Sequence, residues 1–368
     1  MQAVAVPGRV NLIGEHVDYH NLPVLPMAIQ RRIRIDYKGI DDRSVRANSE
    51  HYEAAQVGLD VDLQPGVAGD WSNYIKAAVK AVQSRWDLSH GIEAKVTSDL
   101  PAAAGLSSSS ALLTGFTIAL LRANGMEPTV SELMDVLPDG EQFVGTRGGG
   151  MDHASVLANR QGCALLVEFA PLGLKDVPIP DTWSFVVAHS LKTAEKSGAA
   201  RERYNSRRAA GQTALTRLGI ESYRWAVENR SREELRQMSD SLEGDEQRTF
   251  RHVVSEFGRV QDAMAALRRS DKEAFGDLLC QSHRSLRDDL RVSCAELDEL
   301  VELAMKNKAL GARLTGGGFG GCAIVFCETS DRERMAQALV DGFYAKRSGF
   351  EPSTHLIFAE PSAGALHA

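Results

Sequence analysis

The sequence predicts a chain of mixed α+β class, and three observations lead to this expectation. The chain has 368 residues, which suits two domains or one large domain. Short apolar segments with the character of strands lie on both sides of residues 194–308, a stretch rich in Arg, Glu, Ala and Leu with helical spacing. Three prolines punctuate residues 171–181, where we place the boundary between a domain of residues 1–175 and a domain of residues 176–368.

The individual elements follow from local patterns. Strands are expected over residues 10–13, 31–37, 163–169, 185–188, 322–326 and 355–358. Asp70 is expected to cap a helix that carries Ile75, Val79 and Val82 on one face. Further helices are expected over residues 111–121, 130–137 and 332–345, whereas residues 41–69 are polar and favour a loop.

The bulk composition argues against several classes of partner. A net charge of −7 argues against nucleic acid, because a phosphate backbone requires a basic surface. The longest apolar run, residues 111–121, is too short to span a bilayer, and the N-terminus has no secretory signal pattern. Five cysteines without CxxC spacing indicate neither a disulfide framework nor a zinc site. We therefore expect a cytoplasmic protein without a nucleic-acid or membrane partner.

The segment DLPAAAGLSSSSALLTGFTIALL, residues 99–121, is the most informative part of the chain. A Gly/Ser-rich turn that enters a buried helix presents unpaired backbone N–H groups at the positive end of the helix dipole, which suits a polyphosphate. A serine hydroxyl there can also ligate Mg²⁺. The structural alternative is a serine N-cap on a core helix, for which one of the four serines would suffice.

Two other segments carry candidate functional side chains. Glu15, His16 and Asp18 follow an apolar strand, and they suit hydrogen bonds to several sugar hydroxyls; a metal cluster and a solvated turn are the alternatives. Arg9 precedes that strand. Glycines before Asp152 let its carboxylate approach a ligand, although a helix cap would explain an aspartate here equally well.

Residues 316–321 match the GxGxxG pattern of dinucleotide-binding folds, but the fingerprint requires a helix after the glycines. Here the β-rich run 322–326 follows, so we reject a nicotinamide dehydrogenase. A loop that approaches a ligand and a simple tight turn both remain open. Trp71 and Tyr74, which could line a base pocket, are assigned to the core by their helical spacing.

These segments resemble the motifs of the GHMP small-molecule kinases and, within them, of the galactokinase branch. The three motifs occur in order as RVNLIGEHVDY with VLPMAI (residues 9–29), PAAAGLSSSSA (residues 101–111) and RLTGGGFGGCA (residues 313–323). Similar stretches are GDWSNY (69–74), GGGMDH (148–153), YNSRR (204–208) and SHRSLRDD (282–289). The resemblance covers almost the whole chain.

The resemblance implies ATP-dependent phosphorylation of a monosaccharide on its anomeric hydroxyl, with Mg²⁺ as the metal. It implies an N-terminal α/β domain like the second domain of ribosomal protein S5, a ferredoxin-like α+β C-terminal domain, and a site between them. The partners would be the monosaccharide and ATP, and we expect a monomer. Galactose is the first choice of sugar; N-acetylgalactosamine, arabinose and a uronic acid are alternatives, as is a non-catalytic sugar- and ATP-binding regulator.

The resemblance also assigns roles to residues. Asp152 would take the proton of the sugar hydroxyl, or act electrostatically, with Arg9 beside it to stabilise the transferring phosphoryl group. The sugar would contact Glu15, His16, Asp18, Gly149 and Tyr204. ATP would contact Ala103, Ala104, Gly105, Leu106, Ser107, Ser108, Ser109 and Lys196. Ser109 and Glu141 would hold Mg²⁺. The acidic ligand of typical galactokinases would fall at Gly140, which cannot serve, and Glu141, one residue later, replaces it as in the N-acetylgalactosamine kinase branch.

Overall fold

The computed structural model describes residues 1–67, 69–102, 104–145, 148–193 and 199–367. Its first half is built on a five-stranded sheet in the order β1-β2-β5-β3-β4. The strands are β1 (Gln2–Ile13), β2 (Leu25–Ile40), β3 (Ser44–Ser49), β4 (Ala55–Gly58) and β5 (Gly91–Ser98). All neighbouring strands pair antiparallel except β3 and β5.

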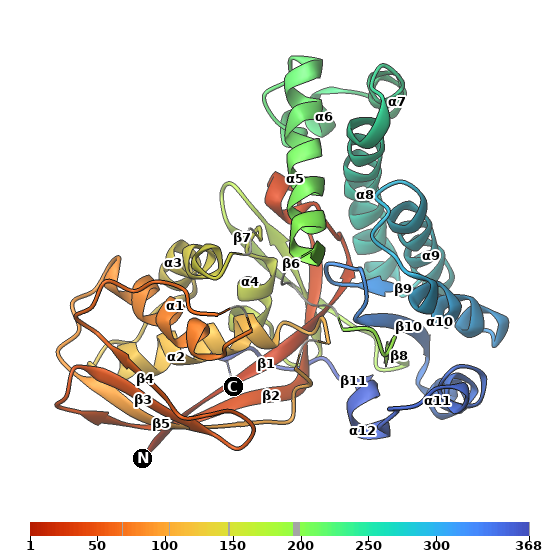
Figure 1. Cartoon of the computed structure of the whole chain (residues 1–368). Coiled ribbons are helices and arrows are strands. Elements are labelled where there is room, and N and C mark those ends of the chain that lie inside the picture. Colours follow the sequence, from red (N-terminus) through yellow and green to blue (C-terminus); the bar gives the residue numbers. More distant parts are fainter. Residues whose placement is uncertain (68, 103, 146–147, 194–198, 368) are drawn as a thin grey trace.

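Four helices accompany this sheet, namely α1 (Ser72–Gln83), α2 (Ser108–Ala123), α3 (Val130–Phe143) and α4 (Met151–Ala158) (Figure 1). The alternation along β2 buries Ile33, Ile35 and Tyr37, as expected for a strand with one covered face. Residues 111–121 of α2 are buried all round, as their composition predicts. The start of this helix is thereby held inside the molecule.

The second half contains a four-stranded antiparallel sheet in the order β11-β8-β10-β9. Its strands are β8 (Trp183–His189), β9 (Gly311–Thr315), β10 (Cys322–Glu328) and β11 (Leu356–Ala359). Phe185 and Phe326 pack on one face with Phe275, whereas Val186 and Val325 join the core on the other. Because both faces are covered, the strands read as continuous apolar runs rather than alternating ones.

The helices of the second half are α5 (Ala199–Leu218), α6 (Tyr223–Asn229), α7 (Arg232–Asp240), α8 (Gly244–Arg269), α9 (Lys272–Asp288), α10 (Ala295–Lys306), α11 (Arg332–Gly342) and the short α12 (Pro352–His355). In Figure 1, α5, α6, α7 and the adjoining part of α8 stand away from both sheets as a projection at the top of the view. None of the helices in the described ranges combines the length and the apolar character needed to cross a bilayer.

A two-stranded sheet of β6 (Cys163–Glu168) and β7 (Gly173–Pro178) lies beside β2. A β-bridge between Val24, just before β2, and Val167 of β6 connects the two. The expected boundary after residue 175 falls inside β7, and the second sheet begins at Trp183. The chain end returns to the first half, where Ser362 donates to the Ala28 carbonyl. One hydrophobic core is therefore continuous between the two halves.

Two expectations about elements are wrong. Residues 41–69 are not a loop throughout, since β3 and β4 lie within them and bury Val45 and Val57. The first strand begins at Gln2 rather than at residue 10, because Val4 and Val6 continue the buried face of β1. Short strands contain too few residues to show a clear alternation of apolar and polar side chains, which is the pattern that predicts a strand. The strands and helices expected elsewhere are present, with shifted ends.

Candidate active site

The centre of the site is a buried ion pair between Arg9 and Asp152. Arg9 lies in β1 and Asp152 in the first turn of α4, and their exposed fractions are 3% and 8%. The guanidinium donates to Asp152 Oδ1 from Nε at 2.8 Å, and Nη2 lies 2.7 Å from the same oxygen. The N-cap of α4 is Gly150, at φ +101°, so Asp152 is not the helix cap. Its carboxylate is committed to the site instead.

The serine run extends this pair toward the start of α2. Ser107 is the N-cap residue, but its hydroxyl does not cap the helix; it donates to Asp152 Oδ2 at 2.6 Å. Ser110 Oγ donates to Glu141 Oε1 at 2.6 Å. Within the described part of the chain, Ser108 and Ser109 make no side-chain hydrogen bond, and both are partly exposed. The run therefore offers two hydroxyls that are bound by carboxylates, at Ser107 and Ser110, and two on partly exposed residues.

Arg9 also connects the ion pair to the backbone of the turn that precedes α2. Its Nη1 donates to the Gly105 carbonyl at 2.7 Å, and its amide donates to the Leu106 carbonyl at 3.1 Å. On the other side of the turn, Cys322 Sγ lies 3.1 Å from the Ala104 carbonyl. A Cβ on Gly316 would come within 3.1 Å of the Gly105 carbonyl oxygen. The turn and the glycine loop 316–321 are thus packed together, and the loop joins two strands, as its sequence predicts.

Asp18 lies in the turn after β1 and faces the glycines before α4. The Gly149 amide donates to Asp18 Oδ2 at 3.1 Å. A Cβ at Gly149 would lie 2.3 Å from the Asp18 carbonyl carbon and from the Tyr19 nitrogen, so only glycine fits. Burial and the neighbouring Asp152 raise the pKa of Asp18 to about 6. This carboxylate is poised to accept hydrogen bonds from hydroxyl groups.

His16 is buried and neutral. Its Nε2 lies 3.2 Å from the Gly317 carbonyl, and since a carbonyl only accepts, Nε2 carries the hydrogen. Nδ1 then accepts from the Tyr19 hydroxyl at 2.8 Å. Burial lowers the pKa of His16 to about 3. The Tyr204 ring, from α5, packs against the His16 ring with centroids 5.1 Å apart.

Glu15 is more strongly engaged by protein groups than its position in the motif suggests. Its Oε1 accepts from the Gly316 amide at 2.6 Å, and Oε2 lies 3.0 Å from Nη2 of Arg313. Arg313 is fully buried and also donates to the Leu12 carbonyl. Burial raises the pKa of Glu15, and Arg313 opposes this rise. The pair ties the turn after β1 to β9 and the glycine loop.

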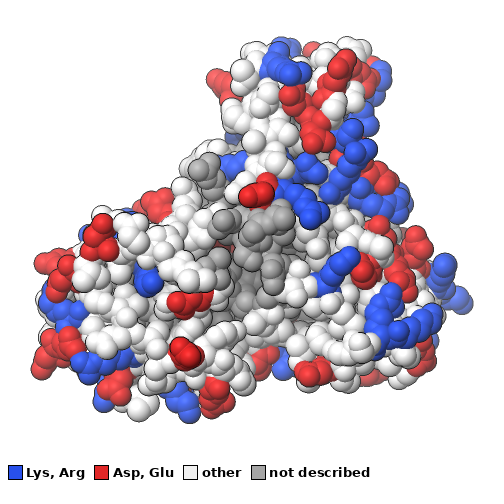
Figure 2. Space-filling model, viewed as in Figure 1, with Lys and Arg blue, Asp and Glu red and all other residues white. Residues whose placement is uncertain are grey.

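A pocket of about 440 Å³, a volume that includes its open mouth, lies among these residues. Its walls contain eight of the predicted site residues, namely Arg9, Glu15, His16, Asp18, Glu141, Gly149, Asp152 and Tyr204. Gly148, Gly150, Met151, Gly316 and Gly317 complete it. Ala103 and Lys196 lie outside the described residues. The face of the molecule in Figure 2 carries acidic and basic side chains interspersed rather than a field of one sign.

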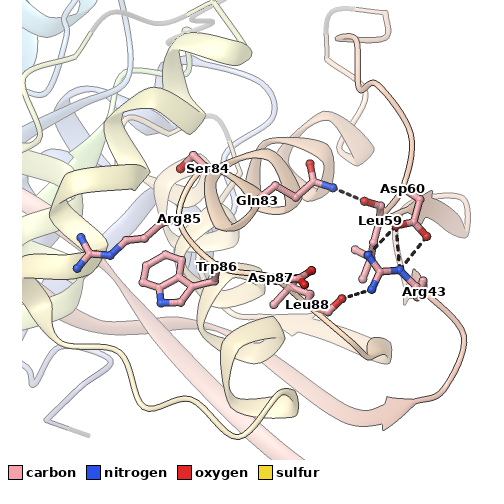
Figure 3. A pocket seen from close by; sticks show the side chains of 9 residues that line it. All are labelled: Arg43, Leu59, Asp60, Gln83, Ser84, Arg85, Trp86, Asp87 and Leu88. Carbon is pink, nitrogen blue, oxygen red and sulfur yellow. Dashed lines mark hydrogen bonds and ion pairs between the residues drawn. The ribbon is translucent and has the colours of Figure 1, made fainter.

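A larger hollow, of about 810 Å³, lies at the end of α1 and contains none of these residues. Figure 3 shows that Arg43 pairs there with Asp60, while Gln83 donates to the Leu59 carbonyl. The Arg43 guanidinium also donates to the Leu88 carbonyl. These contacts join the segments around β3 and β4 to the end of α1, so the hollow has a structural explanation. Trp71, near the start of α1, is a core residue whose Nε1 donates to the Glu53 carbonyl.

Sequence reasoning missed two participants. Arg313 stands in the third motif but received no role; a charged side chain within an otherwise apolar strand was the available signal. Ser110, the last serine of the run, was left out although it contacts Glu141. Which face of a helical turn each serine occupies depends on the helix start, and that position is set by tertiary packing.

Comparison with known families agrees with this geometry. The galactokinase galactose-binding signature matches residues 2–38, the GHMP kinases N terminal domain matches residues 73–160, and the GHMP kinases C terminal model matches residues 263–345. The chain belongs to the GHMP kinases. A mevalonate kinase from L. major shares this fold, with a TM-score of 0.66 at 20% identity over 99% of this chain and 97% of that one.

Within the GHMP kinases the chain belongs to the galactokinases. A galactokinase of Streptomyces coelicolor is 34% identical over 98% of this chain and 92% of its own length, and one of Bos taurus is 36% identical over 93% and 88%. The crystal structure of Lactococcus lactis galactokinase complexed with galactose matches with a TM-score of 0.90 and 28% identity, covering 99% of this chain and 94% of that chain. The family and the two-domain fold predicted from the motifs are confirmed.

Proposed function

We propose that this protein transfers the γ-phosphoryl group of ATP to the anomeric hydroxyl of galactose, giving galactose 1-phosphate and ADP. One observation carries the proposal: the Arg9–Asp152 pair opens into the same pocket as the turn of Asp18 and Gly149, beside the start of α2. The groups proposed to bind sugar hydroxyls, the charged pair and the helix start proposed to bind phosphate are thus adjacent. The curated relatives over nearly the full chain are themselves named galactokinases.

The sugar would lie between the turn after β1 and Tyr204. Asp18 offers a carboxylate that accepts from sugar hydroxyls, and His16 and Glu15 are held rigidly by Gly317 and Arg313 beside it. Tyr204 supplies an aromatic wall. Rigid polar groups in a buried pocket favour a polyol whose hydroxyls match them, because unmatched buried groups cost binding energy.

Asp152 would accept the proton of the anomeric hydroxyl while that oxygen attacks the γ-phosphorus. Such general-base assistance is worth about 10²–10⁴-fold in rate. The contacts of Arg9 and Ser107 favour the ionised carboxylate, because both donate to its oxygens. Arg9 also donates to the Gly105 carbonyl, in the turn proposed to bind the phosphates, so its positive charge would stabilise the transferred group as negative charge develops. The base role and a purely electrostatic role for Asp152 both use this geometry.

The ATP phosphates would lie at the start of α2. The helix dipole is positive at this end, and the partly exposed Ser108 and Ser109 lie in the first turn of the helix. Backbone amides of residues 104–107 would complete the phosphate contacts. The nucleotide contacts of Ala103 and Lys196 remain predictions.

The donor set also fits Mg²⁺. Glu141 is 5% exposed and is held by the Ser110 hydroxyl, and carboxylate and hydroxyl oxygens are the ligands that Mg²⁺ prefers. Glu141, with the partly exposed Ser109, would hold the ion against the phosphates. Mg²⁺ would neutralise charge on the phosphates. The carboxylate at residue 141 then replaces one that Gly140 cannot supply.

The test is an ADP-release assay with MgATP across a panel of monosaccharides, with identification of the phosphorylated product. We expect the highest kcat/KM with galactose. Asp152→Asn should lower kcat by at least about 10²-fold in a protein that remains folded at the assay temperature, whereas Asp139→Asn, an exposed aspartate on α3, should leave kcat unchanged. Sugar and ATP binding without turnover would instead identify a regulator.

Two further expectations, on the oligomeric state and on the location, belong with this proposal. We infer a monomer, which light scattering on the purified protein tests directly. We also infer a cytoplasmic location, because the reaction consumes ATP and all five cysteines are free.

A further inference from the structure

The segment SHRSLRDD, residues 282–289, contributes nothing to the pocket wall, yet its inward side chains are buried. Ser282, His283 and Ser285 project from α9 and are 0%, 3% and 7% exposed. Each contacts a group that leads to the site. Polar side chains buried at this depth require a specific reason, since leaving them unpaired is costly.

Ser282 acts through Glu256 of α8. Glu256 is completely buried, and its Oε1 accepts from Ser282 Oγ at 2.7 Å and from the Gly14 amide at 2.9 Å. Its Oε2 accepts from Arg259 Nε at 2.6 Å. Burial acts to raise the pKa of Glu256, but Arg259 and His252 outweigh it and lower the pKa to about 2. The Gly14 amide is therefore held by a fully charged acceptor.

The backbone at Gly14 is closely packed. Its φ of +104° suits glycine, and a Cβ there would lie 3.0 Å from Val24 Cα and 3.1 Å from Val260 Cγ2. The backbone that precedes Glu15 is thus pressed directly against α8.

His252, one turn earlier on α8, holds the next carbonyl. Its Nε2 donates to the Glu15 carbonyl at 2.9 Å, and its Nδ1 lies 2.9 Å from Ser285 Oγ. The single hydroxyl hydrogen of Ser285 is shared between His252 and Asp289. The Gly14 N–H and the Glu15 C=O, which belong to consecutive residues, are therefore held by two side chains of α8. These side chains are Glu256 and His252.

His283 extends the arrangement to the glycine loop. β9 is the edge strand of its sheet, and the Leu314 amide donates to His283 Nδ1 at 3.3 Å. The opposite ring nitrogen lies 3.3 Å from Asp298 Oδ1. Leu314 leads directly into the glycine loop at 316–321.

We propose that Glu256 and His252, supported by Ser282 and Ser285, are positioning residues that fix the turn Gly14–His16 in its sugar-binding geometry. The role is a specific one: both residues hold backbone groups, and neither lines the pocket. The inference rests on the proposed function for its substrate, but its structural half concerns the free protein.

The test combines hydrogen exchange and kinetics on the full chain. The variants are Glu256→Ala and His252→Leu, with Glu256→Gln and His252→Gln as conservative partners that retain an acceptor for Gly14 and a donor for Glu15. Glu273→Gln, an exposed glutamate on α9, is the matched control. We expect the amide exchange of a peptide covering residues 10–18 to accelerate at least about fivefold in the first two variants. We expect the KM for galactose to rise about tenfold, which corresponds to about 1.4 kcal/mol, while the KM for ATP changes less than about twofold.

In the Gln variants, the amide exchange of residues 10–18 and the KM for galactose should both return most of the way to the wild-type values. A merely structural role would not require this return. If Glu256→Ala does not fold, Ser282→Ala replaces it, with the same direction and a smaller size. Unchanged exchange at residues 10–18 in folded variants, or equal rises in both KM values, would overturn the proposal. A wild-type protein that does not phosphorylate galactose would remove the proposed function only, because the exchange measurement still decides whether these side chains hold the turn.

Discussion

Replacement of Asp18 by asparagine should make the protein more stable and a poorer enzyme. Burial and Asp152 raise the pKa of Asp18 from 3.8 to about 6. Below pH 3.8 the carboxyl is protonated in both the folded and unfolded states and costs nothing. Between about pH 3.8 and 6 the unfolded chain ionises while the folded protein keeps the proton, so the unfolding free energy falls across this window and the loss is complete once the folded carboxyl has also ionised.

The size of the effect follows from the same values. The rise from 3.8 to about 6 corresponds to about 3 kcal/mol of unfolding free energy, fully lost above about pH 7. Near pH 4.5 only about 1 kcal/mol is lost. An asparagine is neutral at every pH, and its side-chain oxygen can still accept from the Gly149 amide. Asp18→Asn should therefore gain up to about 3 kcal/mol at pH 8 and about 1 kcal/mol at pH 4.5.

Urea unfolding of both proteins at the two pH values measures this difference, with Asp139→Asn as control. The kcat/KM for galactose should fall about 10–100-fold, because hydrogen bonds to a charged acceptor are lost. A gain of equal size at both pH values, or no gain at pH 8, would refute the assignment of an ionised, disfavoured carboxylate. If Asp18→Asn lost activity but had the same unfolding free energy as the wild type, the Asp18 carboxylate would be as well stabilised in the protein as in water.

Three further predictions concern the surrounding contacts. Glu141→Gln should raise the Mg²⁺ concentration for half-maximal rate at least about tenfold with little change in the KM for galactose, as an Mg²⁺ titration at saturating sugar would measure. Arg313→Leu should cost about 3–5 kcal/mol in urea unfolding, because Glu15 would remain buried without its partner; a loss below 1 kcal/mol would contradict this. Gly149→Ala should raise the KM for galactose more than about tenfold, since the added Cβ would meet the backbone of residues 18 and 19 at 2.3 Å, and calorimetric titration with galactose would detect the weaker binding.

The central helix shows where sequence reasoning succeeds. The composition of residues 111–121 alone predicts a buried helix, and these residues of α2 are buried. The phosphate site expected from the serines before this helix stays a prediction. The rejection of the dinucleotide pattern at 316–321 likewise needs only the β-rich residues that follow, and β10 is there. These conclusions depend on local composition, which the chain carries whatever its fold.

The contacts of the serine hydroxyls could not be predicted from the sequence. Spacing cannot tell whether Ser107 caps α2 or donates to Asp152, because the choice depends on a residue 45 positions away. The assignment of Ser109 to the metal is untested, although Ser110 is the serine that contacts Glu141. Strands β3 and β4 were missed because four to six residues with polar outward positions give too weak a periodic signal.

The class of chemistry can be read from the chain alone, because it depends on which residue types are present, in which order, and beside which turns and helix starts. How these residues are paired depends on the folded molecule. Arg9 meets Asp152 across 143 residues, and Glu15 meets Arg313 and Gly316 across about 300. Such pairs depend on which backbones pack side by side, and packing is a property of the whole folded chain that no local pattern encodes.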